Sequence, residues 1–371
     1  MLASTGKWHL GLTPESKPIK RGFDETLGFD IIARYLPFGA ASASCKFPDF
    51  FDRYLWANTR YEVSKDNGPF FAPRGYLTDY LAEEAARAIH VNKANPFFMY
   101  MAFTSMHTPL EALQSDYDAV EALETVYGYE KGAPRMTHCQ KVYGAMLLGL
   151  DRAVGTILSA VDAAGISDDT IVIFTNDNGA PLIFPHMNAP YRGGKANLFE
   201  GGIRVDAIVS HLDLFPTIME VAGAGSPGTE PIDGSSLVPL MKAAASRNRV
   251  AASTGNPMVD ESRDGMATDD NKESTAESGH EALFWRSGHY MALRHGDWKL
   301  QVAARPDKKW LYNMKEDPRE MINLAENNAY ESKLIEMLSL LESENSKHSE
   351  PLWPALSETP LLIDKLFHDH Y

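Results

Sequence analysis

Two short runs of consecutive apolar residues constrain the fold more than any other feature of this 371-residue chain. The runs cover residues 96–103 and 170–175, and each has the length of a strand that is buried on both faces, as in a parallel sheet. Apolar residues at helical spacing precede both runs: Leu77, Leu81, Ala85 and Ile89 before the first, and Val142, Met146, Leu150, Val154, Leu158 and Val161 before the second. This alternation predicts an α/β fold with a doubly wound, mostly parallel sheet flanked by helices.

The predicted helices carry end signals. Gly165 is a natural stop for the helix over 140–164, because glycine readily adopts the left-handed conformation that ends helices. A further helix is predicted from about Asp213 to Gly223, with Pro216 tolerated in its first turn.

The composition changes in the last third of the chain. Residues 243–280 are rich in Ser, Thr, Asp, Glu and Gly and lack apolar periodicity, which predicts a linker or an insertion. Short alternating runs then predict a small antiparallel sheet, followed by an amphipathic helix over 328–341 with Leu334, Met337, Leu338 and Leu341 facing inward. The expected organisation is an α/β core over 1–242, the linker, and a C-terminal α+β subdomain over 281–371.

The formal net charge of −15 argues against nucleic acid or an anionic membrane surface as the main partner. An anionic substrate would have to be attracted by local positive charge. No apolar run approaches the roughly 18–20 residues that span a bilayer, so no transmembrane segment is predicted. Cys45 and Cys139 are too few for a disulfide framework, and one bridge or two free thiols fit the sequence equally well.

Four polar strings follow the predicted strand ends or lie in glycine-rich loops. They are Gly6-Lys7-Trp8-His9-Leu10-Gly11, His107-Thr108-Pro109, Asp177-Asn178-Gly179 and Arg192-Gly193-Gly194-Lys195. In open α/β sheets, ligands bind outside the carboxyl ends of the strands, so we expect these strings to converge. Together they supply cations, imidazoles and oxygen ligands suited to a doubly charged tetrahedral oxyanion.

Each string also has an ordinary structural interpretation. Asp177 and Asn178 offer oxygen ligands for Ca²⁺ or Mg²⁺, but Asn-Asp-Asn-Gly is also a common turn sequence. His107 has the chemistry to protonate a leaving oxygen, or it is a structural imidazole before a proline turn. Lys7 and His9 alternate around Trp8, so in an extended segment both side chains would point to one face.

The last string places Lys195 after two glycines, which let the backbone approach a ligand closely. A solvated basic loop is the alternative for Lys195, and a tight turn with surface polar residues is the alternative for Lys7 and His9.

A stretch between the first and second polar strings is rich in aromatic residues. We expect these rings to pack inside the protein rather than to stack on a sugar: Phe47, Phe50, Phe51, Tyr54, Trp56 and Tyr61.

With these motifs the chain resembles a sulfatase of the arylsulfatase type, within the alkaline-phosphatase-like superfamily. The resemblance covers nearly the whole chain. It rests on the Gly-Lys-Trp-His-Leu-Gly string and on the segments 98–109, 170–179, 192–204, 210–217, 293–300, 311–313 and 317–318.

The resemblance implies a sulfuric ester hydrolase that cleaves sulfate esters of aryl or carbohydrate substrates. Lys7 would contact the nucleophile and the sulfate oxygens, and His9 would be the base that breaks down a covalent sulfate intermediate. His107 and Lys195 would bind the substrate and neutralise or protonate the departing alkoxide. Asp177 and Asn178 would ligate Ca²⁺. Relatives of this kind are expected in the secretory pathway, lysosome, extracellular space or periplasm, although no signal peptide opens this sequence.

The sequence departs from the family pattern in two places. The family has a first strand ending in paired aspartates, and a Cys/Ser-x-Pro-x-Arg motif whose first residue becomes formylglycine, the nucleophile. Neither Cys45 nor Cys139 lies in such a motif. The connection from Ile203 to Ser210 is also shorter than in the family, which suggests a deletion or a gene-model error.

We therefore expect an N-terminally truncated homologue with an incomplete calcium site. As given, the chain should be inactive on aryl sulfates and prone to aggregate. Two alternatives remain open: a non-catalytic protein that binds sulfated glycans, and a phosphoester hydrolase of the same superfamily.

Overall fold

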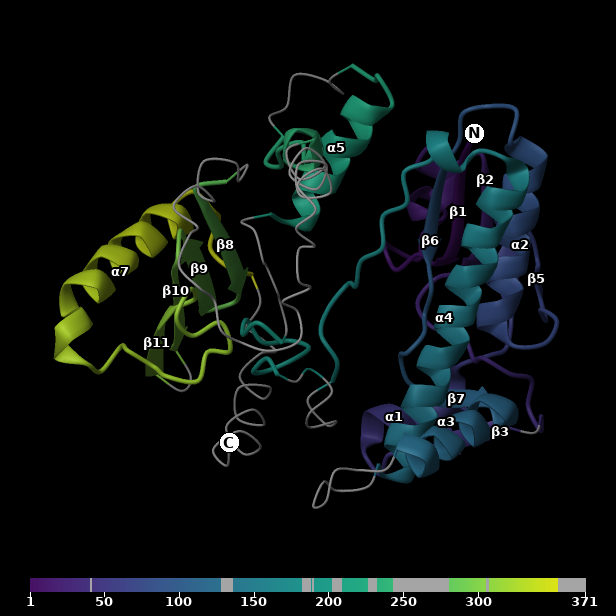
Figure 1. Ribbon diagram of the computed structural model, residues 1–371, viewed down its shortest axis with the longest axis horizontal. Coiled ribbons are helices and arrows are strands. Elements are labelled where there is room, and N and C mark those ends of the chain that lie inside the picture. Colours follow the sequence, from purple (N-terminus) through teal and green to yellow (C-terminus); the bar gives the residue numbers. More distant parts are fainter. Residues whose placement is uncertain are drawn as a thin grey trace, which may run out of the picture. The chain divides into compact units, whose positions relative to one another are not determined.

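The computed structural model describes residues 1–40, 42–127, 136–181, 188, 190–201, 209–225, 232–242, 280–304 and 307–352. The chain divides after Phe174 into two compact units, residues 1–174 and 175–371 (Figure 1). Each unit is described by itself.

The first unit contains a five-stranded mixed sheet in the order β5-β4-β2-β1-β6. Its core is parallel, with β1 pairing to β2 on one side and to β6 on the other, while β4 and β5 are antiparallel. The strands are β1 (Leu2–Lys7), β2 (Glu25–Phe29), β4 (Val63–Lys65), β5 (Phe70–Phe71) and β6 (Phe98–Ala102). The predicted parallel α/β core is therefore confirmed, and the run at 96–103 forms β6.

Helices cover this sheet as the spacing predicts. Leu77 and Leu81 of α2 (Leu77–Asn92) pack against Leu27 and Phe29 of β2. The long helix α4 (His138–Ala164) packs in turn on α2, beside α3 (Gln114–Tyr127), and ends at Gly165 with φ 70° (Figure 1). Both predicted helices are confirmed.

By length and composition alone α4 could cross a membrane, which is weak evidence because a core helix of a soluble protein passes the same test. Within the unit, its Val142, Ala145 and Met146 side chains are fully buried. Arg152 of α4 also forms ion pairs with Asp79 of α2 at 3.0 Å and Asp116 of α3 at 2.7 Å. These contacts are those of a packed helix.

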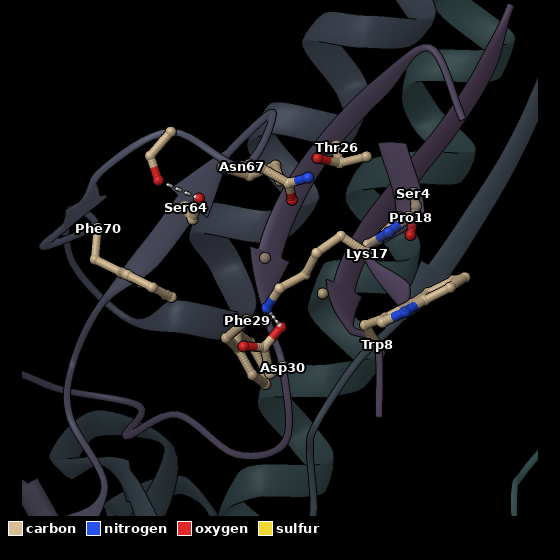
Figure 2. Close-up of a pocket in the computed structure, with 14 residues that line it drawn as sticks. Ser4, Trp8, Lys17, Pro18, Thr26, Phe29, Asp30, Ser64, Asn67 and Phe70 are labelled. Atoms are coloured by element: carbon tan, nitrogen blue, oxygen red, sulfur yellow. Dashed lines mark hydrogen bonds and ion pairs between the residues drawn. The ribbon is translucent and has the colours of Figure 1, made fainter. Parts of the chain in front are cut away.

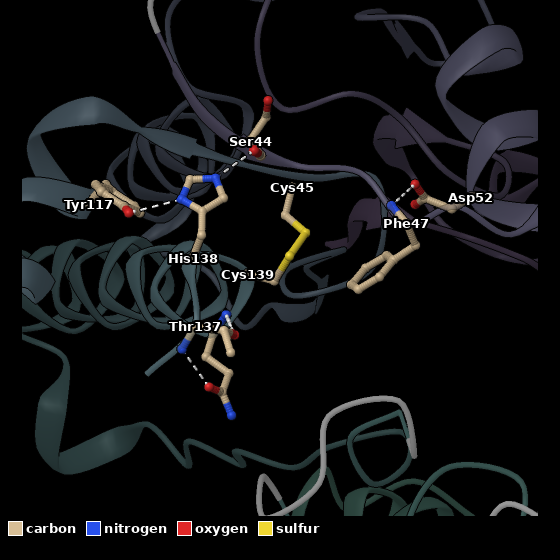
Figure 3. Close-up of a disulfide and its surroundings, with 9 residues drawn as sticks. Ser44, Cys45, Phe47, Asp52, Tyr117, Thr137, His138 and Cys139 are labelled. Carbon is tan, nitrogen blue, oxygen red and sulfur yellow. Dashed lines mark hydrogen bonds between the residues drawn. A yellow bond between two sulfur atoms is a disulfide. The ribbon is translucent and has the colours of Figure 1, made fainter. Parts of the chain in front are cut away.

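A second, two-stranded sheet pairs β3 (Ser42–Cys45) with β7 (Leu110–Leu113) in antiparallel register. Helix α1 (Phe50–Asn58) follows β3. A disulfide joins Cys45 of β3 to Cys139 in the first turn of α4, 94 residues further along the chain (Figure 3). The structure thus contains a bridge, one of the two alternatives that the sequence left open.

The predicted strand over 170–175 is wrong. Within the described part of the chain these residues have no ladder partner, and Ile171 and Phe174 are 50% and 69% exposed. A strand needs an unpaired edge beside it as well as apolar residues, because its backbone groups must be paired. Among the described strands, β6 is one edge of its sheet and pairs with β1 alone, so residues 170–175 do not extend the sheet there.

The second unit contains helix α5 (Leu214–Val221) and a four-stranded antiparallel sheet in the order β11-β10-β9-β8. The strands are β8 (Ala282–Ser287), β9 (Tyr290–His295), β10 (Trp298–Ala304) and β11 (Asp307–Asn313). Met337 and Leu341 of α7 (Glu331–Asn345) pack on one face of that sheet. The C-terminal sheet and helix are confirmed. Residues 243–279 lie outside the described part, so the linker and the boundaries around it stay predictions.

Candidate functional site

The string Gly6–Gly11 begins at the carboxyl end of β1, a strand with a neighbour on each side. Only glycine fits its first position, since φ is 107° and a Cβ there would lie 2.1 Å from the carbonyl oxygen of Ala102. The amide of Trp8 donates to the carbonyl of Phe29 at 3.1 Å, which continues the contact with β2. Lys7, half-buried, is therefore held at the sheet edge where open α/β folds bind ligands.

His9 departs from the extended geometry that the sequence predicts. β1 ends at Lys7, and His9 has φ 54°, in the left-handed region that residues other than glycine rarely adopt. The alternation that would put the two side chains on one face therefore stops before His9. Backbone strain of this kind clusters at functional sites, so it favours a functional role for the exposed imidazole of His9.

His107 follows β6, and its ring nitrogens have distinct roles. Nδ1 lies 2.6 Å from the carbonyl oxygen of Thr108. A carbonyl only accepts, so this contact requires a hydrogen on Nδ1. In the neutral ring Nε2 is then the basic nitrogen, and it is the atom suited to exchange a proton with a substrate.

Tyr35 fixes the backbone of the His107 segment. Its hydroxyl donates to the carbonyls of Thr104 at 2.8 Å and of His107 at 3.0 Å. Burial raises the pKa of Tyr35 well above its ordinary value, so the hydroxyl stays a neutral donor. The carboxylate of Glu111 accepts from the amide of Tyr35 at 3.2 Å and pairs with Arg34. Two long-range contacts thus hold the segment that carries the imidazole.

Because β1 and β6 are parallel neighbours, the chain leaves both at the same edge of the sheet. Gly6 pairs with Ala102, so Lys7 lies one residue beyond this register position and His107 five residues beyond it. The structure therefore places the first two strings at one edge of the first unit, as the sequence predicts.

The other two strings both belong to the second unit, and a backbone hydrogen bond joins Lys195 to the residue that follows Gly179. The amide of Lys195 donates to the carbonyl of Ala180 at 3.0 Å, and the side chain of Asn188 bonds both backbone groups of Ala180. A Cβ on Gly179 would lie 1.8 Å from the carbonyl oxygen of Gly201, so only glycine fits. Backbone contacts therefore hold the Asp177–Gly179 string against the loop that carries Lys195.

The Lys195 loop is anchored on the C-terminal sheet. Phe199 is fully buried against Trp310 and Tyr312. The guanidinium of Arg192 lies 4.3 Å from the centre of the Phe199 ring and donates to the Tyr312 hydroxyl at 3.2 Å. These contacts fix both ends of the segment between Arg192 and Phe199, and Lys195 lies between them.

A buried ionic cluster lies at the end of this loop. The ammonium of Lys299 in β10 lies 2.7 Å from Glu200 and 3.0 Å from Glu320, and all three side chains are buried. Burial raises the pKa of Glu320, and Lys299 opposes this rise. The cluster joins the Lys195 loop to the sheet through charge-assisted hydrogen bonds, which are stronger than neutral ones.

Asp177 and Asn178 supply the kind of oxygen that Ca²⁺ prefers, but too few. Asp177 is exposed, and the amide nitrogen of Asn178 donates to the carbonyl of Gly179 at 2.9 Å. The cation takes about six to eight oxygens. The described residues contain no group of three or more His, Cys, Asp or Glu side chains that could hold a metal. The donor chemistry fits Ca²⁺, and the ligand set is incomplete within the described residues.

A small cavity of about 100 Å³ lies on the first sheet (Figure 2). Small residues of β1 and β2 form its floor, and Trp8 and the Lys17–Asp30 ion pair form one side. None of the predicted catalytic or metal-binding side chains lines it, so we do not assign it to the site.

The comparisons with known proteins agree with these motifs. A family model described as sulfatase matches residues 3–224, which is more than half of the chain. The N-acetylgalactosamine-6-sulfatase of Mus musculus is 32% identical over 269 residues, covering 64% of this chain and 45% of that protein. The steryl-sulfatase of Homo sapiens is 32% identical over 196 residues, covering 46% of this chain and 30% of that protein.

Solved structures show the same fold. The crystal structure of Ps i-CgsB in complex with k-i-k-neocarrahexaose superposes with a TM-score of 0.68 at 24% identity, over 98% of this chain and 75% of that one. This chain spans less than half the length of the curated relatives it matches. The family model, the polar strings at the strand ends and the shared fold lead to one conclusion: the chain belongs to the sulfatase family.

Proposed function

We propose that this chain binds a sulfate monoester and carries the leaving-group chemistry of a sulfuric ester hydrolase. The observation that carries the proposal is the placement of Lys7 and His107 at one edge of a parallel sheet, in a chain of the sulfatase family. Ligand binding at this edge is general for open α/β sheets.

The residue chemistry supports the proposed roles. The ammonium group of Lys7 offsets the charge of the sulfate oxygens, in a chain whose net charge of −15 would otherwise repel an anion. Lys195, in the second unit, is a further cation of the kind that suits such an oxygen. If a nucleophile bonds to sulfur, the bond from sulfur to the leaving oxygen breaks, and that oxygen then needs a proton. The Nε2 atom of a protonated His107 is suited to donate it, because Nδ1 already donates to Thr108. His9 would serve as the base that breaks down the covalent sulfate intermediate left by such a nucleophile.

Asp177 and Asn178 would hold a Ca²⁺ ion as part of a larger ligand set. The bound cation would supply positive charge to the sulfate oxygens. The proton transfer assigned to His107 is independent of that ion.

The presence or absence of a nucleophile decides between two candidate functions, hydrolysis and binding alone. Both cysteines of this sequence are joined in one disulfide, so neither is a free thiol and neither lies in a formylglycine motif. Without a nucleophile, the cationic residues would bind a sulfate ester and leave it intact. Non-catalytic binding of a sulfated glycan is therefore the second candidate.

We also propose an oxidising location for the chain, such as the secretory pathway, the extracellular space or the periplasm. The Cys45–Cys139 disulfide supports it, since such bridges form and persist in oxidising compartments.

The test is a comparison of nitrophenyl sulfate with nitrophenyl phosphate, in the presence of Ca²⁺. We expect the purified chain to bind the sulfate ester more tightly than the phosphate ester, and to release no nitrophenol above a His107→Ala control. Release above that control would contradict the assignment of a missing nucleophile. Tighter binding of the phosphate ester would favour the phosphoester hydrolase instead.

A further inference from the structure

Helix α1 presents aromatic side chains to solvent instead of burying them. Phe50, Phe51 and Tyr54 are 82%, 59% and 53% exposed, whereas Asp52 and Leu55 form the buried side of the helix. A surface helix ordinarily has the opposite pattern, with polar residues outward. The sequence favoured packing for these rings, and the structure shows that this prediction is wrong for these three.

The exposed rings form one surface. Phe50 and Tyr54 are four residues apart, hence on the same face of the helix, and their rings are stacked with centres 6.4 Å apart and planes at 28°. Arg53 is exposed and three residues from Phe50, so it borders the same face. We call Phe50, Phe51, Arg53 and Tyr54 the aromatic platform.

The charged residues around the platform include both signs. The two acidic residues of this segment are already engaged: Asp49 caps α1 by accepting from the amide of Asp52 at 2.9 Å, and Asp52 accepts from the amide of Phe47 at 2.7 Å (Figure 3). Lys46, Asp49 and Arg53 are exposed, and Asp52 is buried. Lys46 and Arg53 therefore supply cations for individual anionic groups of a ligand, without a net positive charge around the platform.

Contacts connect α1 to the segment that carries His107. The ammonium of Lys46 and the guanidinium of Arg34 lie 4.7 Å and 4.9 Å from the centre of the Trp56 ring in α1. Arg34 also pairs with Glu111, whose carboxylate binds the amide of Tyr35. Tyr35 in turn holds the carbonyl of His107. All these residues belong to the first unit.

We propose that the aromatic platform binds the saccharide part of a sulfated carbohydrate. The inference rests on the proposed function, because His107 would protonate the leaving oxygen and the alcohol must then extend on the His107 side. A pyranose ring has an apolar C–H face that an aromatic ring covers, and hydroxyls at its rim that remain in water. Arg53 and Lys46 suit further sulfate or carboxylate groups of a charged oligosaccharide.

A sterol sulfate is the competing ligand, and the geometry disfavours it. A sterol exposes a large apolar surface, so its binding requires an enclosed apolar pocket. The rings of the platform are more than half exposed. An open surface of this kind suits a thin ring that remains partly hydrated.

The experiment is equilibrium binding by the full chain, measured by calorimetry with defined probes. The probes are a chondroitin 6-sulfate hexasaccharide, a carrageenan hexasaccharide, the desulfated form of each, a steroid monosulfate and nitrophenyl sulfate. The variant is Phe50→Ala/Tyr54→Ala, whose exposed side chains leave the core intact. The matched control is Phe71→Ala, because Phe71 is a 41% exposed ring of the same unit in β5.

We expect at least one sulfated hexasaccharide to bind more tightly than nitrophenyl sulfate. In the double variant, the affinity for that hexasaccharide should fall about tenfold, and the affinity for nitrophenyl sulfate should not change. The control Phe71→Ala should bind every probe as the parent chain does. Equal hexasaccharide affinity in parent and double variant would overturn the inference, as would binding of the steroid sulfate alone. If nitrophenyl sulfate binds but no hexasaccharide gains from the platform, the proposed function survives and this inference does not. If a hexasaccharide binds through the platform but nitrophenyl sulfate does not bind, this inference survives and the proposed function does not.

Discussion

At the scale of single residues, the side chains that position the site contact partners far away in sequence. The Tyr35 hydroxyl reaches carbonyls 69 and 72 residues further along the chain, and Lys299 reaches Glu200 99 residues before it. These side chains have no role in the proposed proton transfer. They hold the backbone of the segments that carry His107 and Lys195.

The first prediction concerns the Tyr35 hydroxyl. Tyr35→Phe removes the donor shared by the carbonyls of Thr104 and His107, so the free energy of unfolding should fall by about 1–2 kcal/mol. Urea denaturation measures this change. Tyr54→Phe removes an exposed hydroxyl and serves as the control, with an expected change below about 0.5 kcal/mol. Equal effects of the two substitutions would show that the hydroxyl of Tyr35 does not stabilise the segment.

The second prediction concerns the pH dependence of the buried ionic cluster. Burial raises the pKa of Glu320 above its ordinary value of 4.5, so the folded chain takes up this proton at a higher pH than the unfolded chain does. This contribution to stability is fully present below pH 4.5 and is lost as the pH rises through the folded pKa. Glu320→Gln keeps the residue neutral and removes the dependence.

The measurement is the free energy of unfolding of both proteins from pH 4.5 upward to pH 7. We expect the stability of the parent chain relative to Glu320→Gln to decrease as the pH rises. Glu316→Gln, at an exposed position nearby, should follow the parent curve. Parallel curves for parent and Glu320→Gln would contradict the direction of the pKa change.

Sequence reasoning found the motif residues and missed the supporting ones. Lys7, His107 and Lys195 are recognisable from the glycines, prolines and strands next to them. Tyr35 and Lys299 carry no such signal, because their roles depend on contacts across tens of residues. Lys299 lies in an alternating strand, where a lysine ordinarily points to solvent, and only the fold reveals that it is buried.

At the scale of elements, the disulfide fixes β3 to α4. Cys45 is buried, and the bridge closes a loop of 94 residues that includes α1, α2 and β6. A cross-link of this length restricts the unfolded chain strongly. It also anchors the residue that precedes Lys46 and the segment leading into the aromatic platform.

The third prediction follows from this cross-link. Cys45→Ser/Cys139→Ser should lower the free energy of unfolding by about 2–4 kcal/mol. Denaturation of the parent chain with and without reductant is the control, and the reduced parent should unfold at the same denaturant concentration as the double variant. A parent chain whose midpoint does not move on reduction would show that the bridge does not contribute to stability.

The spacing of apolar residues predicted the helices and the parallel strands correctly, but one apolar run does not form a strand. The helices α2, α4 and α5 need only their own residues for their hydrogen bonds, so periodicity and caps locate them. Residues 170–175 have the composition of a strand but pair with none of the described strands, although β6 has an open edge among them. Pairing depends on the rest of the sheet, which the composition of a single run cannot report.

At the scale of the whole molecule, the chain is a sulfatase-family polypeptide whose proposed residues are shared between two units. Lys7, His9 and His107 belong to residues 1–174, and Asp177, Asn178 and Lys195 to residues 175–371. The central claim is functional: Lys7 and His107, at one edge of the sheet in the first unit, act on one sulfate ester.

The most direct test is the affinity of the full chain for nitrophenyl sulfate in four variants. Lys7→Ala and His107→Ala should each weaken binding about tenfold or more, because each removes a proposed contact with the same ester. Lys20→Ala and Lys315→Ala, at exposed positions of the two units, should leave the affinity unchanged. If nitrophenyl sulfate binds with equal affinity to the parent chain and to Lys7→Ala or His107→Ala, the account is contradicted.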